Sequence, residues 1–306
     1  MKKLLFYLAI YISPNWIAFN PAIGQEYLNI GIFTDNQYCN CAVEGVRNYP
    51  ASLDKLDSVI RFFNASKVDA IFHLGDMIDH GFSSYDSVIP RYRRSMIPVN
   101  FVLGNHDYAV NAALKEKVLP MLGLSSGNYT KIIGNWEFII LNGNDLSYFA
   151  PQTKSQKQER NTMVADLASG VRKNIMPWNG GISQEQLSWF NTQLLESQKS
   201  GRNVIVLCHF PVYPSSSYNL WNDQELVYLM SRYSCIKACF NGHYHRGNYN
   251  FANGIHFVNF KGMVNTTETA YAIVSISADS ILINGYGREP DRKLKIGTAP
   301  GAAIQH

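Results

Sequence analysis

The sequence of 306 residues predicts an α/β fold (α+β in some schemes), a double β-sheet sandwich flanked by helices. Along most of the chain, short continuous apolar segments alternate with segments of helical periodicity, which is typical of strands buried on both faces of a sheet. Between residues 254 and 286, apolar segments follow one another without a helix, and this run suggests a second sheet. A hydrophobic content of 46% and a charged content of 16% indicate a globular protein with a sizeable core rather than a disordered chain.

Strands are expected where short apolar runs end at a polar residue. They cover residues 27–33, 68–76, 97–107, 136–142, 203–210 and 235–243, followed by three short β segments between 254 and 286. A helix is expected over residues 52–63, because Leu53, Leu56 and Ile60 recur there at helical spacing. Alternation of this kind places helices on both faces of the predicted sheets.

A second helix is expected over residues 183–197, where Ser183 and Gln186 have the spacing of a capping box. The polar stretch 151–182 before it has little periodicity, so we expect a long loop or insertion there. Neither an internal repeat nor a clear linker interrupts the pattern, and residues 25–306 are therefore predicted to form one domain.

The first 24 residues have the pattern of an export signal. Lys2 and Lys3 form a positive region, residues 4–12 are apolar, and Ala22 and Gly24 place small side chains at the −3 and −1 positions of a cleavage site. Nine apolar residues are too few to span a bilayer comfortably, so no stable membrane insertion is expected after cleavage. We therefore expect a signal peptide over residues 1–24 and a periplasmic or secreted protein; an uncleaved N-terminal anchor and a buried N-terminal strand are the alternatives.

The cysteines are odd in number, so they cannot all pair within the chain. They are Cys39, Cys41, Cys208, Cys235 and Cys239. An exported protein permits disulfides, but these spacings do not match a structural zinc framework. Cys208 and Cys239 both end apolar runs, which favours buried free thiols at these two positions.

The charge distribution excludes a nucleic-acid interface. The net charge is +4, from 27 basic and 23 acidic residues, and Lys2 and Lys3 supply half of the excess. The densest basic segment is residues 91–95, which we expect to be a solvated surface or a helix end. No further run of Lys and Arg forms the basic stripe that nucleic acids require.

Residues with metal-binding side chains follow five of the predicted strands. They are Asp35-x-Gln37, Gly75-Asp76-Met77-Ile78-Asp79, Gly104-Asn105-His106-Asp107, His209, and Gly242-His243-Tyr244-His245. The carboxyl ends of such strands converge on one crevice, where these side chains would form a polynuclear metal site. Carboxylate, amide and imidazole ligands together suit Mn²⁺, Fe or Zn²⁺. Each segment alone has an ordinary explanation as a turn or a packed side chain, but five in this order indicate a metal site.

The remaining histidines are read as packed or surface residues. They are His73, His80, His256 and His306. His73 lies inside a predicted strand, two residues before Gly75, and we expect it to pack in the core.

The ordered metal-binding segments resemble the calcineurin-like metallophosphoesterase superfamily over nearly all of residues 28–295. That family has a double-sheet sandwich with a dinuclear metal centre. A closer similarity links this chain to the manganese-dependent ADP-ribose/CDP-alcohol diphosphatases, a branch in which glutamine stands where most relatives have histidine. It rests on Gln37, on Arg47, Tyr49 and Ser52, and on the stretches WNGGISQEQLSWFN (178–191), HFPVYP (209–214) and GREPDR (287–292).

The resemblance implies a role for each matching residue. Asp35, Gln37 and His245 would hold one metal ion, and Asn105, His209 and His243 the other, with Asp76 bridging both. His106 would approach the leaving group without binding metal, and Asp79 and Asp107 would orient the histidines. Arg47 and Arg288 are candidates for binding substrate phosphates, with a structural salt bridge as the alternative for each.

The reaction implied is hydrolysis of a phosphoanhydride in a small-molecule nucleotide such as ADP-ribose or a CDP-alcohol. Two divalent ions would stabilise both the attacking and the departing oxygen; the resemblance implies Mn, and Fe, Zn and Mg are the alternatives. The ligands cannot separate this activity from that of an exported phosphomonoesterase or phosphodiesterase. A non-catalytic binding module is the remaining alternative, and the complete set of ligands together with His106 argues against it.

Overall fold

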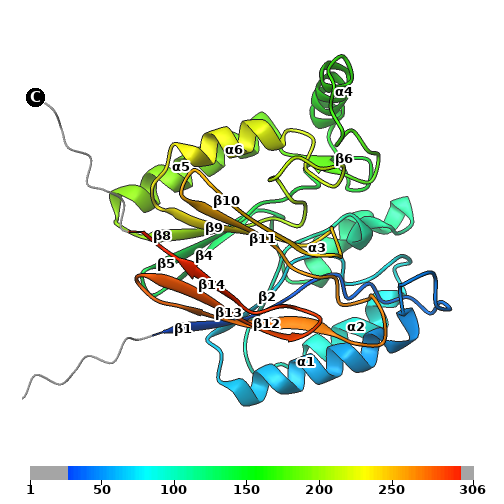
Figure 1. Cartoon of the computed structure of the whole chain (residues 1–306). Helices are drawn as coiled ribbons and strands as arrows, with labels where there is room; N and C mark the ends of the chain where they lie inside the picture. Colours follow the sequence, from blue (N-terminus) through cyan, green and yellow to red (C-terminus); the bar gives the residue numbers. More distant parts are fainter. Residues whose placement is uncertain (1–26, 298–306) are drawn as a thin grey trace, which may run out of the picture.

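The computed structural model of the protein describes residues 27–297 and contains two six-stranded sheets packed face to face (Figure 1). The predicted signal peptide, residues 1–24, lies outside the described residues. The first sheet consists, in spatial order, of β14 (Arg292–Lys295), β13 (Ser280–Gly287), β12 (Ala270–Ile276), β1 (Leu28–Phe33), β2 (Ala70–His73) and β3 (Val99–Phe101). The strands β1, β2 and β3 are parallel to one another.

The second sheet has a parallel centre and antiparallel edges. It consists, in spatial order, of β10 (Asn248–Ala252), β11 (Ile255–Asn259), β9 (Ile236–Asn241), β8 (Asn203–Leu207), β5 (Trp136–Ile140) and β4 (Tyr129–Ile133). β11, β9, β8 and β5 are parallel neighbours. A separate pair is formed by β6 (Leu146–Ser147) and β7 (Gly180–Gly181).

The double-sheet sandwich is confirmed, but the prediction that the late strands form the second sheet is wrong. β12, β13 and β14 extend the first sheet beside β1, while β10 and β11 complete the second. β12 pairs antiparallel with β1 through Leu28 opposite Ile276 and Ile32 opposite Ala272. The chain therefore returns to its first strand, and each sheet gains strands from the C-terminal part.

The main core lies between the two sheets. The facing side chains include Ile32, Phe72, Phe138, Phe240 and Ile283, all fully buried. The rings of Phe72 from the first sheet and Phe138 from the second have centroids 4.6 Å apart. Burial of this apolar area is the main stabilising contribution to the sandwich, and it fixes the relative position of the strands that carry the polar segments.

Helices cover the two outer faces (Figure 1). α1 (Ser52–Ser66) and α2 (Ser84–Tyr92) pack on the first sheet, and α5 (Gln184–Lys199) and α6 (Asp223–Ser231) on the second. Shorter helical segments are η1 (Tyr49–Ala51), η2 (His106–Tyr108), η3 (Ala112–Lys117) and α3 (Val118–Met121). The predicted helix over 52–63 is confirmed, and residues 91–95 do form a helix end, where Arg91 and Arg94 pair with Asp57.

The start of α5 forms only half of the predicted capping box. The Ser183 hydroxyl accepts a hydrogen bond from the Gln186 backbone N–H at 3.2 Å. The Gln186 side chain, however, bonds to the backbone of Asn142 and to the Asp145 carboxylate, and that carboxylate also takes the Ser183 N–H at 3.0 Å. Because the Asp145 carboxylate accepts from the Ser183 backbone N–H, that N–H does not need the hydrogen bond to the Gln186 side chain that would complete the capping box.

Of the two alternatives for residues 151–182, the long loop is wrong, because the stretch contains α4 (Lys154–Ala168). A complete capping box of Thr153 and Gln156 begins this helix. None of its residues is buried, and the helix stands away from both sheets (Figure 1). One face of the helix is half-buried, but that face includes Gln156, Glu159 and Arg160, so the apolar stripe by which helices are detected in sequence is missing.

A disulfide joins Cys39 and Cys41, while Cys208, Cys235 and Cys239 are buried free thiols. The predicted burial of Cys208 and Cys239 is confirmed. Within residues 27–297, no helix has the length and apolar character needed to cross a bilayer.

Candidate metal centre

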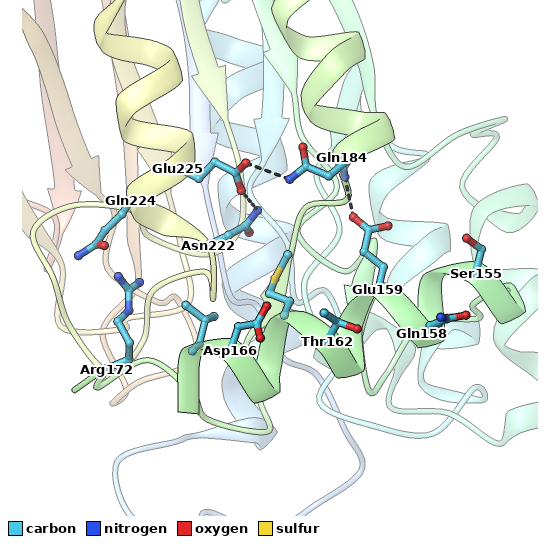
Figure 2. Close-up of a pocket in the computed structure, with 12 residues that line it drawn as sticks. Ser155, Gln158, Glu159, Thr162, Asp166, Arg172, Gln184, Asn222, Gln224 and Glu225 are labelled. Atoms are coloured by element: carbon cyan, nitrogen blue, oxygen red, sulfur yellow. Dashed lines mark hydrogen bonds between the residues drawn. The ribbon is translucent and has the colours of Figure 1, made fainter. Parts of the chain in front are cut away.

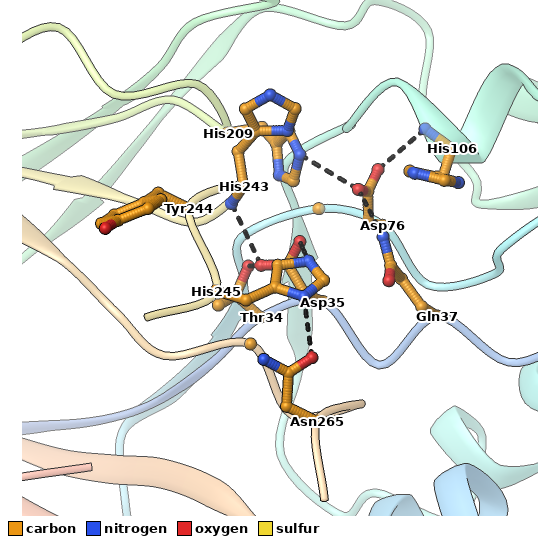
Figure 3. A network of polar contacts seen from close by, with 12 residues as sticks. Thr34, Asp35, Gln37, Asp76, His106, His209, His243, Tyr244, His245 and Asn265 are labelled. Carbon is orange, nitrogen blue, oxygen red and sulfur yellow. Dashed lines mark hydrogen bonds and ion pairs between the residues drawn. The ribbon is translucent and has the colours of Figure 1, made fainter. Parts of the chain in front are cut away.

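Parallel strands deliver the predicted site residues to one edge of the sandwich. Asp35 follows β1, Asp76 follows β2 and Asn105 follows β3; His209 follows β8, and His243 and His245 follow β9. The labelled side chains of this set point toward a common centre (Figure 3). The structure thus brings together residues that are more than 200 positions apart in sequence, with Asp35 Oδ1 at 3.0 Å from His245 Nε2.

Asp76 lies at the middle of the cluster and is fully buried. Its Oδ1 accepts a hydrogen bond from the His106 backbone N–H at 2.9 Å. Its Oδ2 accepts one from Gln37 Nε2 at 3.1 Å. The same oxygen lies 3.2 Å from His209 Nε2, but these two atoms do not have the geometry of a hydrogen bond. Burial alone would raise the pKa of Asp76, but the neighbouring His209 and His106 outweigh it and lower the pKa. The carboxylate is therefore ionised at neutral pH.

Asp35 forms a second buried acid next to His245. Its Oδ2 accepts from the Thr34 hydroxyl at 2.7 Å and from the His243 backbone N–H at 3.1 Å. Burial again opposes the charge, and His245 and His209 lower the pKa of Asp35 overall. His245 Nδ1 in turn contacts Asn265 Oδ1 at 3.1 Å, which fixes the ring with Nε2 toward Asp35 (Figure 3).

Hydrogen bonds also fix the tautomers of the two other histidines. His209 Nδ1 lies 2.8 Å from the Leu74 carbonyl oxygen, which can only accept, so Nδ1 carries the proton and Nε2 faces Asp76. His243 Nε2 lies 3.0 Å from Asn179 Oδ1. The Asn179 amide nitrogen donates to two carbonyls, which assigns its oxygen to the histidine. His243 thus presents Nδ1 as a free lone pair.

Several buried polar atoms in this cluster lack a hydrogen-bond partner. They are Gln37 Oε1, Asn105 Oδ1 and His209 Nε2. Buried polar atoms are rarely left unsatisfied, because an unpaired one costs about 1–3 kcal/mol. One atom each from Asp76, His209 and His243 also lie within 4.8 Å of one another. Carboxylate, amide and imidazole donors in this arrangement fit a divalent cation such as Mn²⁺, Fe²⁺ or Zn²⁺.

The electrostatic field of the centre points to the same kind of ligand. Burial lowers the pKa of His209, but the attraction of Asp76 and Asp35 raises it to about 9 overall. Burial dominates at His243, whose pKa is well below its ordinary value. The two buried carboxylates therefore create a negative field that a divalent cation would neutralise.

The glycines of the metal-binding segments permit close approach of backbone to ligand. A Cβ atom on Gly104 would lie 2.0 Å from Asp76 Oδ1, and one on Gly242 would lie 2.1 Å from the Thr34 hydroxyl and 2.7 Å from Asp35 Oδ2. Neither space can hold a methyl group, which explains why glycine precedes Asn105 and His243.

Four of the ligand candidates have a left-handed backbone, a conformation that non-glycine residues rarely adopt. The φ values are 53° at Asp35, 42° at Gln37, 60° at Asp76 and 64° at His243. Such residues cluster at sites where the surrounding structure enforces the conformation. The strand ends are bent in this way so that the side chains turn into the centre.

His106 is held at the side of the centre by Asp79. Its Nδ1 donates to the Asp79 carbonyl oxygen at 2.7 Å and lies 3.5 Å from the carboxylate oxygen Oδ1. That carboxylate also accepts from the Tyr49 hydroxyl at 3.1 Å and contacts His80 Nδ1 at 2.7 Å. His106 therefore directs Nε2 away from Asp79, and its side chain is partly exposed.

The Asp107 carboxylate forms no hydrogen bond to a histidine within residues 27–297, so the expectation that it orients one directly is wrong. Its carboxylate accepts hydrogen bonds from the backbone N–H groups of Asp76 at 3.0 Å, Gly104 at 2.9 Å and Met77 at 2.8 Å. Burial and the charge of Asp76 raise the pKa of Asp107 to about 7. Its task is to fasten the two loops that carry Asp76 and Asn105.

The two arginine candidates differ in their contacts. Arg47 forms an ion pair with Asp79 at 3.3 Å, the structural alternative that the sequence left open. Arg288 donates instead to the carbonyl oxygens of Gly262 at 2.5 Å and Glu268 at 3.1 Å. It forms no ion pair within residues 27–297.

Sequence reasoning assigned no role to three residues that support the centre, namely Asn179, Asn265 and Lys55. Lys55 Nζ donates to the carbonyl oxygens of residues 263 to 266, the nearest at 2.7 Å, and so holds the loop that carries Asn265. Burial and the nearby Arg288 lower the pKa of Lys55 to about 8. Asn179 stands in the quoted stretch 178–191, which was the only sequence signal for any of the three.

A wide groove in the described part of the chain lies away from this centre. A cavity of about 690 Å³ separates α4 from the N-terminal ends of α5 and α6 (Figure 2). Its polar lining includes Glu159, Asp166 and Glu225 with Arg172, and it contains none of the candidate ligands. Its acidic lining does not suit a phosphate-bearing substrate.

Comparison with known proteins was consistent across sequence and structure. Residues 28–247 match the family model of the calcineurin-like phosphoesterases. The chain is 28% identical to the manganese-dependent ADP-ribose/CDP-alcohol diphosphatase of Mus musculus, covering 89% of this chain and 95% of that protein. Identity to the Homo sapiens protein of the same name is 27%, with 88% and 92% covered. A crystal structure of a dimetal phosphatase from Danio rerio superposes with a TM-score of 0.80 at 20% identity, covering 89% of this chain and all of that one.

Proposed function

The chain belongs to the calcineurin-like phosphoesterase family and is a metal-dependent phosphohydrolase, and from this premise we propose that it cleaves the phosphoanhydride of nucleoside diphosphate derivatives. The substrates would be ADP-ribose or CDP-alcohols such as CDP-choline and CDP-glycerol. The products are a nucleoside monophosphate and a phosphomonoester. The names of the relatives support this substrate class.

The observation that carries the proposal is the set of unpartnered buried atoms around Asp76. In our assignment, Asp35, Gln37 and His245 would hold one divalent ion and Asn105, His209 and His243 would hold the other, and Asp76 would be available to both. The orphaned atoms of Gln37, Asn105 and His209 are distributed over both groups, which supports two ions rather than one. Mn²⁺ is the proposed metal. When bound, the ions supply an activated water and neutralise phosphate charge.

The chain's own residues position the leaving group. His106 Nε2 is the free ring nitrogen, because Nδ1 donates to the Asp79 carbonyl. In the proposed reaction His106 hydrogen-bonds the departing phosphate oxygen or protonates it. The Asp79 carboxylate, 3.5 Å from His106 Nδ1, lies on the same side of the ring and leaves Nε2 free. Asp79 is itself held by Tyr49 and Arg47.

A substrate panel with Mn²⁺ tests the proposed activity. ADP-ribose and CDP-choline should be hydrolysed with much higher kcat/KM than a cyclic nucleotide or a simple aryl phosphate. The nucleoside monophosphate and the phosphomonoester should form in equal amounts. Preferential turnover of the aryl phosphate or of the cyclic nucleotide would identify a phosphomonoesterase or a phosphodiesterase instead.

We also propose that the protein is exported. The N-terminal pattern of residues 1–24 supports this proposal, and the disulfide between Cys39 and Cys41 suits an oxidising compartment. N-terminal sequencing of the protein isolated from its native cells should begin near Gln25. Recovery of an intact Met1 in the protein from the cytoplasm would contradict export.

A further inference from the structure

A small basic cavity opens beside the metal ligand candidate His245. It has a volume of about 310 Å³, and its lining includes His245, Asn265, Arg246, Lys261 and Arg288. We call it the basic pocket. Three of these side chains are permanent cations at neutral pH, and the pocket therefore has a positive charge next to the centre that binds phosphate in the proposed reaction.

The cations of the basic pocket have no carboxylate partner. No ion pair within 4.0 Å involves Arg246, Lys261 or Arg288 in the part of the chain that the structure describes. The nearby Glu289 is engaged by Arg292 and by the Lys261 backbone N–H at 2.7 Å. Glu268 and Glu289 attract Arg288 at longer range, and Glu289 also attracts Lys261. Grouped cations repel one another, so a cluster whose acidic neighbours lie beyond ion-pair distance is suited to an anionic ligand.

The side chain of Arg288 in the basic pocket is held in place by the backbone. Arg288 donates to the carbonyl oxygens of Gly262 and Glu268, which fixes its guanidinium group without neutralising it. A Cβ atom on Gly262 would lie 2.6 Å from His245 Cγ, so the residue that anchors Arg288 is in close contact with the ring of the metal ligand candidate. A guanidinium group that is already fixed loses little conformational entropy when it binds a phosphate, and this favours binding.

The basic pocket lies on a different side of the centre from His106. In Figure 3, Asn265 and His106 lie on opposite sides of the pair Asp35 and Asp76. In the proposed reaction, the attacked phosphate lies at the metal ligands and the departing phosphate lies at His106. The basic pocket is therefore a third position for an anion.

We propose that the basic pocket binds a third anionic group of the substrate, a phosphate outside the anhydride that is cleaved. The inference rests on the proposed function and narrows its substrate class to phosphoanhydrides that carry an additional phosphate. Lys261 and Arg246 neutralise that group at the opening of the pocket, and Arg288 meets it with the planar fork that suits phosphate oxygens.

A pair of substrates that differ by one phosphate tests the proposal. With Mn²⁺ present, the enzyme should hydrolyse ADP-ribose 2′-phosphate with a kcat/KM about tenfold higher than that for ADP-ribose, mainly through a lower KM. In Lys261→Met and Arg246→Gln variants the ratio of the two values should fall toward one. Lys131→Met removes a charge from the exposed side of β4 and should leave the ratio as it is.

Inorganic polyphosphates give a second measurement that does not depend on the ribose. Tripolyphosphate should inhibit ADP-ribose hydrolysis at about tenfold lower concentration than pyrophosphate, and Lys261→Met should abolish the difference. The proposal is overturned if neither three-phosphate compound is preferred, or if a preference survives in both variants. Failure of the wild-type enzyme to hydrolyse any phosphoanhydride would instead refute the proposed function.

Discussion

At the scale of single residues, hydrogen bonds give His106 and His209 different tasks. His209 is fully buried and directs Nε2 at Asp76, whereas His106 is partly exposed and is held from behind by Asp79. His209→Ala should therefore abolish both metal binding and activity. His106→Ala should retain the metal and lose roughly 10²–10⁴-fold in kcat. Metal analysis beside steady-state kinetics checks both variants; a metal-free His106→Ala protein would contradict the division of roles.

Gln37 is expected to influence how tightly the site of Asp35, Gln37 and His245 binds its metal ion. Its Oε1 is buried and unpartnered, while its Nε2 donates to Asp76. An amide oxygen is a weaker donor than imidazole, so Gln37→His should raise Zn²⁺ affinity by tenfold or more and shift the metal preference away from Mn²⁺. Competition with a chromophoric chelator measures the affinities. Unchanged affinities for both metals would exclude Gln37 as a ligand.

At the scale of elements, the helix α1 holds the loop of residues 263–266 next to the metal centre. Lys55 on α1 donates to the carbonyls of residues 263 to 266, and Asn265 in this loop contacts His245. Lys55→Met should weaken Mn²⁺ binding by about tenfold, as is typical when the support of a metal ligand is lost. It should also lower the free energy of unfolding by about 1–3 kcal/mol.

Arg61→Met is the matched control for that experiment, because Arg61 lies on the same helix and is exposed. This variant should bind Mn²⁺ as the wild type does. Isothermal titration with Mn²⁺ separates a positioning role of Lys55 from a purely structural one. A Lys55→Met protein that is less stable but has normal Mn²⁺ affinity would show that the loop does not position His245.

At the scale of the whole molecule, the centre links the two halves of the sandwich. Asp35 and Asp76 follow strands of the first sheet, and His209 and His243 follow strands of the second. Ions bound between them should stabilise the complete fold, by about 2.7 kcal/mol for each ion when Mn²⁺ is at about a hundred times its Kd. Thermal unfolding with Mn²⁺ and with EDTA measures this. The stabilisation should persist in His106→Ala and disappear in Asp76→Ala.

The fold and the location of the site were predictable because both depend on local patterns. A buried strand is recognisable from its apolar run, and parallel strands must end at the same edge, so Asp35, Asp76 and Asn105 were expected together. The strand order was not predictable, since periodicity does not specify which strands pair. For that reason the return of β12 to β1 was missed.

The supporting residues were harder to predict than the ligand candidates. Asn179 and Asn265 are neutral amides that act through a single hydrogen bond each, and no spacing identifies them. Lys55 has the sequence pattern of an ordinary surface lysine on a helix, yet its ammonium group is directed at backbone carbonyls. α4 escaped detection because the face that it packs against the rest of the molecule is largely polar, as Glu159 and Arg160 show.

The left-handed backbone at four of the ligand candidates has a consequence for the evolution of this protein. Asp35, Gln37, Asp76 and His243 occupy a conformation that disfavours L-residues by about 1–2 kcal/mol and that glycine adopts freely. Selection for folding alone would therefore favour glycine at these positions, and each such change would remove a metal ligand. The polar side chains found there in this chain therefore point to a requirement other than folding, which the proposed metal binding supplies. A lineage released from that selection would lose the ligands first and keep the sandwich.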